Sequence, residues 1–152
     1  MNRNDIEIMA PAGSYESLMA AIQGGADSVY FGVEELNMRA ASSINFSLDE
    51  LRNIADICND NNKKSYLTIN VVVFDQEIEQ MHRIVDAAIK SGISGIIASD
   101  LSVINYAFRS GIEVHLFNFI VKNDHIDSEI TFNIVLTTDA GNVPEIIKCK
   151  ID

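Results

Sequence analysis

The sequence has no tryptophan, only two cysteines and only 11 basic residues among its 152 positions. Cys58 and Cys149 cannot build a disulfide framework or a four-thiolate metal site unaided, so both are interpreted as ordinary buried thiols. No cofactor and no metal site are predicted. No unbroken apolar run approaches the roughly 20 residues that span a bilayer, so no membrane segment is expected.

Basic charge is scarce relative to acidic charge. The chain has 11 Lys and Arg against 22 Asp and Glu, which gives a formal net charge of −11. Phosphate binding depends on clustered Lys and Arg, so a nucleic acid is not an expected partner. The first residues lack the features of a signal peptide, and a cytoplasmic location is expected.

Apolar, β-rich runs alternate with helical patterns along most of the chain. Small residues and Ser14 begin the first helix, and the pair Ser47 and Glu50 forms a capping box before the second. The predicted strands cover residues 6–9, 27–32, 65–73, 93–98 and 113–117, and the later helices cover 78–89 and 100–109. This alternation indicates parallel strands joined by crossover helices.

The predicted fold class is α/β, with about four and a half βα units. Two architectures fit: an open doubly wound sheet, or a partial (β/α) barrel. A complete eight-fold barrel needs about 250 residues, so this chain cannot close one alone.

The pattern changes near residue 118. Apolar residues alternate with polar ones over 130–136 and again over 147–151, and residues 139–142 offer a turn between them. Alternation on both sides of a glycine-containing turn predicts an antiparallel β-hairpin. The expected domains are therefore 1–118, the βα repeats, and 119–152, a divergent tail whose hairpin packs on the sheet edge.

Several short motifs occur in order along residues 5–117. They are found at 9–14, 25–32, 37–40, 45–47, 68–70, 99–101 and 114–116. With these motifs the chain resembles the amino-terminal half of the collagenase-like peptidase family of unclassified mechanism, number thirty-two in that class.

The resemblance implies an eight-stranded β/α barrel with its working groups at the carboxyl ends of the strands. Members include collagenases and proteases, and others hydroxylate transfer RNA, ribosomal RNA or the ubiquinone ring, some with an iron–sulfur cluster on cysteines. Those cysteines have no counterpart here. By resemblance, the mouth of the barrel would hold Glu7, Arg39, Asn70, Asp100 and His115.

The predicted catalytic residues are Glu7, Asp100 and His115, because strand ends gather titratable groups at one edge of a parallel sheet. Asp100 could instead cap a helix, and His115 could be a hydrogen-bonded structural group. Sequence alone leaves these alternatives open.

The predicted substrate-binding residues are Gly13, Ser14, Arg39 and Asn70. Backbone amides at a helix start can hold a phosphate or carboxylate, although Gly13 and Ser14 could simply form a capped turn. Arg39 could be a surface cation. Asn70 is a polar amide within a β-branched run, where burial requires partners.

The leading hypothesis is a truncated member of this family that hydrolyses peptide substrates, with a peptide or small molecule as partner. The first alternative is a non-catalytic binding or assembly module, a homo-oligomer formed through strand edges. The second is the remnant of an RNA or ubiquinone hydroxylase.

Overall fold

The computed structural model describes residues 7–33, 36 and 46–116, together with the backbone of 132–136 and 145–149. The chain divides into two compact units, Met1–Phe117 and Asn118–Asp152.

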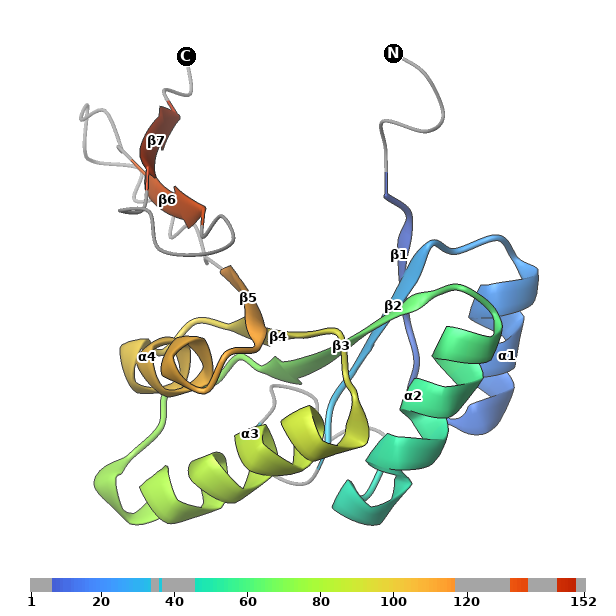
Figure 1. Cartoon of the computed structure of the whole chain (residues 1–152), viewed down its shortest axis with the longest axis horizontal. Coiled ribbons are helices and arrows are strands. Elements are labelled where there is room, and N and C mark those ends of the chain that lie inside the picture. The colour runs from blue at the N-terminus through green and yellow to red at the C-terminus, as the bar shows by residue number, and fades with distance from the viewer. Residues whose placement is uncertain (1–6, 34–35, 37–45, 117–131, 137–144, 150–152) are drawn as a thin grey trace, which may run out of the picture. The chain divides into compact units, whose positions relative to one another are not determined.

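The first unit is built on a five-stranded parallel sheet (Figure 1). The strands lie side by side in chain order and pair in parallel throughout. They are β1 (Met9–Pro11), β2 (Ser28–Phe31), β3 (Lys64–Ile69), β4 (Gly95–Ala98) and β5 (Glu113–Leu116).

The sequential strand order bears on the doubly wound sheet, one of the two architectures that the sequence allowed. A doubly wound sheet requires a point at which the strand order reverses. The five described strands contain no such reversal. The right-handed crossovers usual for parallel strands then place all the connecting helices on one face of the sheet.

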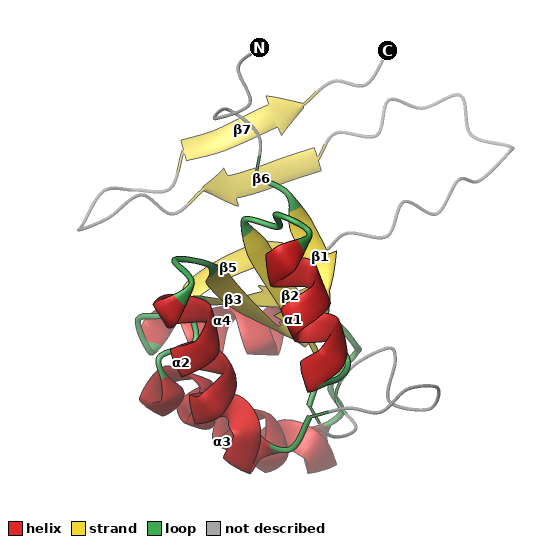
Figure 2. Cartoon of the chain, turned by 90° about the vertical axis from the view of Figure 1, so that its right-hand side faces the viewer, coloured by secondary structure: helices red, strands yellow, loops and turns green. Residues whose placement is uncertain are grey.

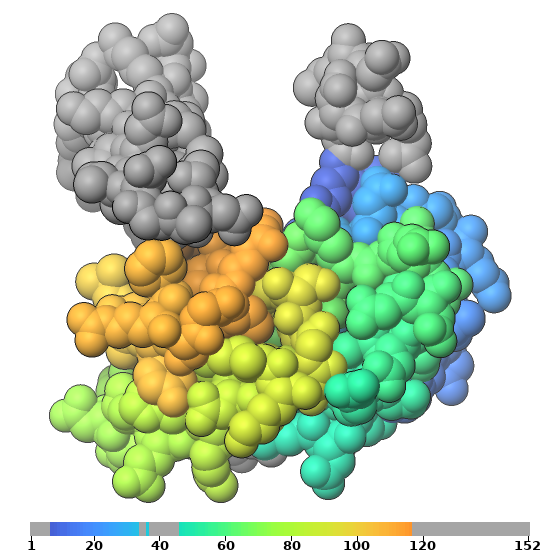
Figure 3. All heavy atoms as spheres, viewed as in Figure 1, coloured from blue at the N-terminus to red at the C-terminus, as the bar shows by residue number. Residues whose placement is uncertain are grey.

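Four helices cover this face, and Figure 2 distinguishes them from the strands. They are α1 (Tyr15–Gln23), α2 (Leu51–Asp60), α3 (Ile78–Ser91) and α4 (Leu101–Arg109). The short 3-10 turns η2 (Leu48–Glu50) and η3 (Asp75–Glu77) precede α2 and α3. In the space-filling view the atoms of α2, α3 and α4 form a continuous outer surface (Figure 3).

The helix starts follow their capping residues. Ser14 is the N-cap of α1, and the Glu50 carboxylate accepts hydrogen bonds from the Ser47 amide at 2.7 Å and the Ser47 hydroxyl at 2.9 Å. This capping box opens a 3-10 turn rather than the α-helix itself, and α2 begins one turn later at Leu51.

The core lies between the helices and alternate strand residues. Val29, Phe31, Leu67, Ile69 and Ile96 are buried there against the apolar stripes of the helices. Neighbouring strand residues point to the other face, because side chains alternate along a strand.

Cys58 belongs to the apolar stripe of α2. Its side chain is fully buried, as the helical spacing predicted. Burial raises the pKa of its thiol to about 11, so it has the properties of a small apolar core residue.

Strand β3 ends earlier than the sequence predicted. The β-branched run continues to Val73, but the ladder stops at the pair of Ile69 with Ala98. Neither β2 nor β4 extends further, and the Val73 amide donates to the Asp100 carboxylate instead, at 3.1 Å. The chain therefore leaves the sheet at Asn70.

In the second unit, β6 (Phe132–Leu136) pairs antiparallel with β7 (Glu145–Cys149), with Phe132 opposite Cys149. Across the described residues of both units, no helix combines the length and the apolar character needed to cross a membrane.

Candidate functional site

Polar side chains gather on the sheet face opposite the helices, which we call the polar face. Alternation along the strands, together with the composition of the core on the other side, assigns its members. They are Ser28 and Tyr30 from β2, Lys64, Tyr66 and Thr68 from β3, Gly95 and Ile97 from β4, and Glu113 and His115 from β5.

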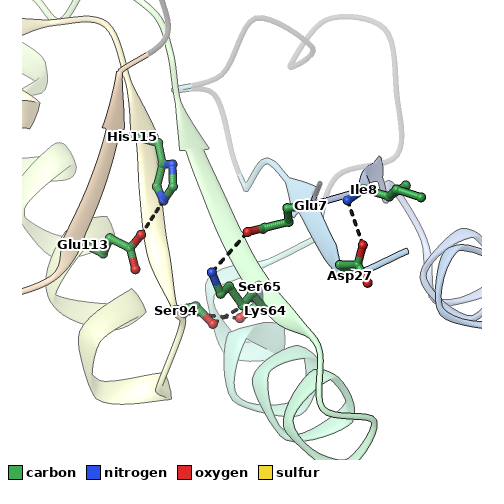
Figure 4. A network of polar contacts seen from close by, with 8 residues as sticks. All are labelled: Glu7, Ile8, Asp27, Lys64, Ser65, Ser94, Glu113 and His115. Carbon is green, nitrogen blue, oxygen red and sulfur yellow. Dashed lines mark hydrogen bonds and ion pairs between the residues drawn. The ribbon is translucent and has the colours of Figure 1, made fainter. Parts of the chain in front are cut away.

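An ion pair connects the start of β1 to the start of β3 on this face. The Nζ atom of Lys64 lies 3.1 Å from a carboxylate oxygen of Glu7, and Figure 4 shows the two side chains reaching toward each other. The hydroxyls of Ser28 and Tyr66 are buried beside this pair. Neither hydroxyl meets hydrogen-bond geometry with a residue that the structure describes.

These neighbours change the charge state of the pair. Partial burial by itself raises the pKa of Glu7, but the nearby Ser28 hydroxyl and the Lys64 ammonium outweigh it, so the net pKa is lowered. Contact with the Glu7 carboxylate raises the pKa of Lys64. Both groups are therefore charged at neutral pH.

A second polar pair lies on β5. The Nε2 atom of His115 is 2.7 Å from the Glu113 carboxylate (Figure 4). The imidazole also meets the ring of Tyr66 edge to face, with 4.6 Å between ring centroids. The His115 side chain is 38% exposed, so its ring is held on two sides while remaining open to solvent.

Gly95 allows this contact between strands that are not adjacent. A Cβ atom at Gly95 would lie 3.1 Å from the Tyr66 ring and 3.0 Å from the carbonyl oxygen of Glu113. The Tyr66 ring therefore passes over β4 at a position where any side chain would displace it. Together β3, β4 and β5 place the aromatic ring, the imidazole and the Glu113 carboxylate at one place.

Asp100 lies at the carboxyl end of β4, where it caps α4. Its carboxylate accepts hydrogen bonds from the Ser102 amide at 2.8 Å, from the Ser102 hydroxyl and from the Val73 amide. Burial raises the pKa of Asp100, but these donors outweigh that effect and leave it lowered. The carboxylate thus joins the loop after β3 to the start of α4.

The amides at the start of α1 already have an acceptor. The Ser17 hydroxyl oxygen accepts hydrogen bonds from the amides of Gly13 and Ser14, each at 2.9 Å. Glu16 lies in the same first turn, and its contact with the helix amides lowers its pKa. An anion bound at Gly13 and Ser14 would have to displace the Ser17 oxygen.

The predicted site residues do not all share one edge of the sheet. Asn70 and Asp100 follow the carboxyl ends of β3 and β4, and His115 is the third residue of β5. Glu7 precedes β1 and pairs with Lys64, the first residue of β3, so it lies at the amino ends of the strands. The prediction that Glu7 joins the carboxyl-end rim is therefore wrong in geometry. Arg39 lies outside the described residues.

Lys64, Tyr66 and Glu113 were missed by the sequence reasoning. Lys64 and Tyr66 are two residues apart on one strand, as are Glu113 and His115. That spacing places each pair on one face, which is a signal available from the sequence once the strands are assigned. No group of three or more His, Cys, Asp or Glu side chains among the described residues is arranged to hold a metal ion.

The fold and this polar face define an α/β protein with a singly wound parallel sheet. Residues 13–119 match the model of Peptidase family U32, and the chain belongs to this family. The resemblance read from the sequence motifs is thereby confirmed for the amino-terminal part of the chain.

Curated relatives carry several names. The chain is 60% identical over 116 residues to a collagenase of Porphyromonas gingivalis, a match that covers 76% of this chain and 28% of that protein. It is 39% identical over 110 residues to an uncharacterized protease of Methanocaldococcus jannaschii, covering 72% of this chain and 27% of that one. It is also 30% identical over 112 residues to tRNA hydroxylation protein P1 of Bacillus subtilis, a match that covers 72% of this chain and 26% of that protein. The matches thus span little more than a quarter of each relative.

Proposed function

We propose that the chain forms the amino-terminal part of a (β/α) barrel that hydrolyses peptides, with the polar face lining the interior of the barrel. Sequential parallel strands with helices on one face are the arrangement that such barrels repeat. Relatives named collagenase and protease support a peptide as the substrate class. The observation that carries the proposal is the carboxylate–imidazole pair of Glu113 and His115 on the polar face.

In this mechanism His115 is the general base. A water molecule gives a proton to the imidazole, and its oxygen adds to the carbonyl carbon of the peptide. The C–N bond then breaks and the departing amine takes the proton from the imidazolium, so the histidine is restored. Asn70, at the carboxyl end of β3, is proposed to bind the peptide backbone through its amide group.

The other predicted site residues have more limited roles in this proposal. Glu7 contributes a negative charge beside Lys64 rather than contacting the scissile bond. Asp100 acts by holding the loop after β3 against α4. Gly13, Ser14 and Arg39 remain proposed contacts to the substrate.

The test is hydrolysis of gelatin and casein by the purified chain. We expect His115→Ala to reduce turnover by about 10²- to 10⁴-fold, the range typical for loss of a general base. Glu79→Ala, an exposed substitution on α3, should leave turnover unchanged and serves as the matched control. Wild-type protein without turnover, or turnover unaffected in His115→Ala, would refute the proposal.

A second candidate function is assembly with another copy of the chain. Within the described residues, β1 and β5 are edge strands of a parallel sheet, which leaves main-chain groups available for pairing. A two-fold axis parallel to the strands would place β5 of one copy beside β1 of the other in parallel. Light scattering tests this, and a strict monomer at high concentration would count against it.

The similarity to a tRNA hydroxylation protein supports a third candidate, an RNA-modifying role. The net charge of −11 is unfavourable for that partner. Tight RNA binding that weakens steeply with salt would favour this role over peptide hydrolysis.

A further inference from the structure

We propose that Glu113 and Tyr66 are positioning residues for His115, and that they make Nδ1 the ring atom that exchanges protons with a ligand. Glu113 fixes the proton on Nε2, and the ring of Tyr66 fixes the plane of the imidazole. The identity of the ligand rests on the proposed function, whereas the proton position on His115 does not.

The chemistry of the carboxylate–imidazole pair determines where the proton of His115 lies. An ionised carboxylate can only accept a hydrogen bond, so the 2.7 Å contact requires a proton on Nε2. In a neutral imidazole the lone pair is then on Nδ1. When Nδ1 gains a proton, the Nε2–H bond to Glu113 becomes charge-assisted at both ends.

The ring of Tyr66 holds the imidazole of His115 in place. Tyr66 is fully buried, and its ring meets the imidazole at an interplanar angle of 66°. The absence of a side chain at Gly95 gives the Tyr66 ring the space it occupies. The contact joins a side chain of β3 to a side chain of β5 across β4, so it depends on the arrangement of three strands. A chance pair of neighbouring surface residues would not depend on such an arrangement.

Solvent can reach the pair of Glu113 and His115. The side chain of His115 is 38% exposed and that of Glu113 is 52% exposed, so the pair does not serve to fill the core. An exposed polar pair of this kind contributes only about 0–1 kcal/mol to stability. Figure 4 shows Nε2 turned to Glu113, while Lys64 and Glu7 form their own pair farther along the polar face.

The experiment is ¹⁵N NMR of the imidazole nitrogens in histidine-labelled protein at a pH where His115 is neutral. His115→Gln assigns its signals against those of the other two histidines. In the wild type we expect a single tautomer with the proton on Nε2 and an observable hydrogen-bonded Nε2–H proton. Glu113→Ala should lose that proton signal and show both tautomers.

Two further variants separate positioning from general structural damage. Glu113→Gln keeps an acceptor oxygen, so it should retain more of the Nε2–H tautomer than Glu113→Ala. Tyr66→Phe keeps the ring and should preserve the wild-type pattern. Glu79→Ala is the matched control for removal of one acidic side chain.

The inference is overturned if the wild type carries its proton on Nδ1, or if Glu113→Ala leaves the signals of His115 unchanged. Either result is obtained without a substrate. Failure of peptide hydrolysis with the expected tautomer would refute the proposed function and leave the proton assignment intact.

Discussion

The role of the Asp100 carboxylate can be tested sharply, because the sequence predicts a catalytic role for it and the geometry indicates that it caps helix α4. Asp100→Ala removes the acceptor for the amides of Ser102 and Val73 and for the Ser102 hydroxyl. Loss of an N-cap costs about 1 kcal/mol. The part-buried Val73 amide, left without its charged acceptor, adds about 1–2 kcal/mol. We expect a total loss of about 2–3 kcal/mol in the free energy of unfolding.

Urea unfolding of the wild type, Asp100→Ala and Asp100→Asn measures this loss. Asparagine caps helices about as well as aspartate, but its single oxygen can accept from Ser102 and not also from Val73. Asp100→Asn should therefore keep the cap and lose only the contribution of the Val73 amide, about 1–2 kcal/mol. The pKa of Asp100 is lowered in the folded state, so its stabilisation is fully present above the ordinary pKa of 3.8. It is lost as the pH falls through the lower folded value.

A loss below about 0.5 kcal/mol in Asp100→Ala at pH 7 would refute the capping assignment. Asp100→Asn provides the opposite test for catalysis. If that variant stays folded under the assay conditions but no longer hydrolyses gelatin, the carboxylate acts chemically and not only as a cap.

Three further outcomes are expected. Gly95→Ala should lose about 1–3 kcal/mol in urea unfolding, because the new methyl group would lie 3.1 Å from the aromatic ring above it; an unchanged midpoint would contradict that packing. Lys64→Met should change the unfolding free energy by less than about 1 kcal/mol at pH 7, since this ion pair is exposed. In the same variant the lowered pKa of Glu7 should rise toward 4.5 in a carboxyl NMR titration, so the stabilisation it contributes above pH 4.5 shrinks. Cys58, studied in Cys149→Ala protein, should resist a thiol reagent until the chain unfolds.

Local patterns in the sequence predicted local structure well. Ser14 lies where α1 begins, and the Ser47–Glu50 capping box opens the 3-10 turn that leads into α2. Cys58 is buried on the helical face that its spacing indicated. These features depend on residues within about one or two helical turns, so a sequence window contains their causes.

Pairing between strands was less accessible to the sequence. The β-branched run after Ile69 has the composition of a strand, but neither neighbour extends far enough to pair with it. The partner for the Val73 amide is Asp100, 27 residues away along the chain. No window around the run includes that information.

The candidate site shows the same division. The sequence singled out His115, and the spacing of Glu113 on the same strand already placed both on one face. Tyr66 became a partner of His115 only when β3, β4 and β5 were placed in register. Glu7 was expected at the carboxyl-end rim, yet it lies at the amino ends of the strands beside Lys64. The position of a residue along a sheet depends on where its strand begins relative to the neighbouring strands, and a β-rich pattern alone does not define that start.

The sequence by itself determined the family, the alternation of strands and helices, and the starts of the helices, because each is encoded in contiguous residues. Only the tertiary structure decided the sequential order of the strands, the absence of a reversal among them and the grouping of Tyr66, Gly95, Glu113 and His115. Those features arise from hydrogen bonds and packing between segments that are distant in the chain. The free energy of these contacts depends on how the segments are placed relative to one another.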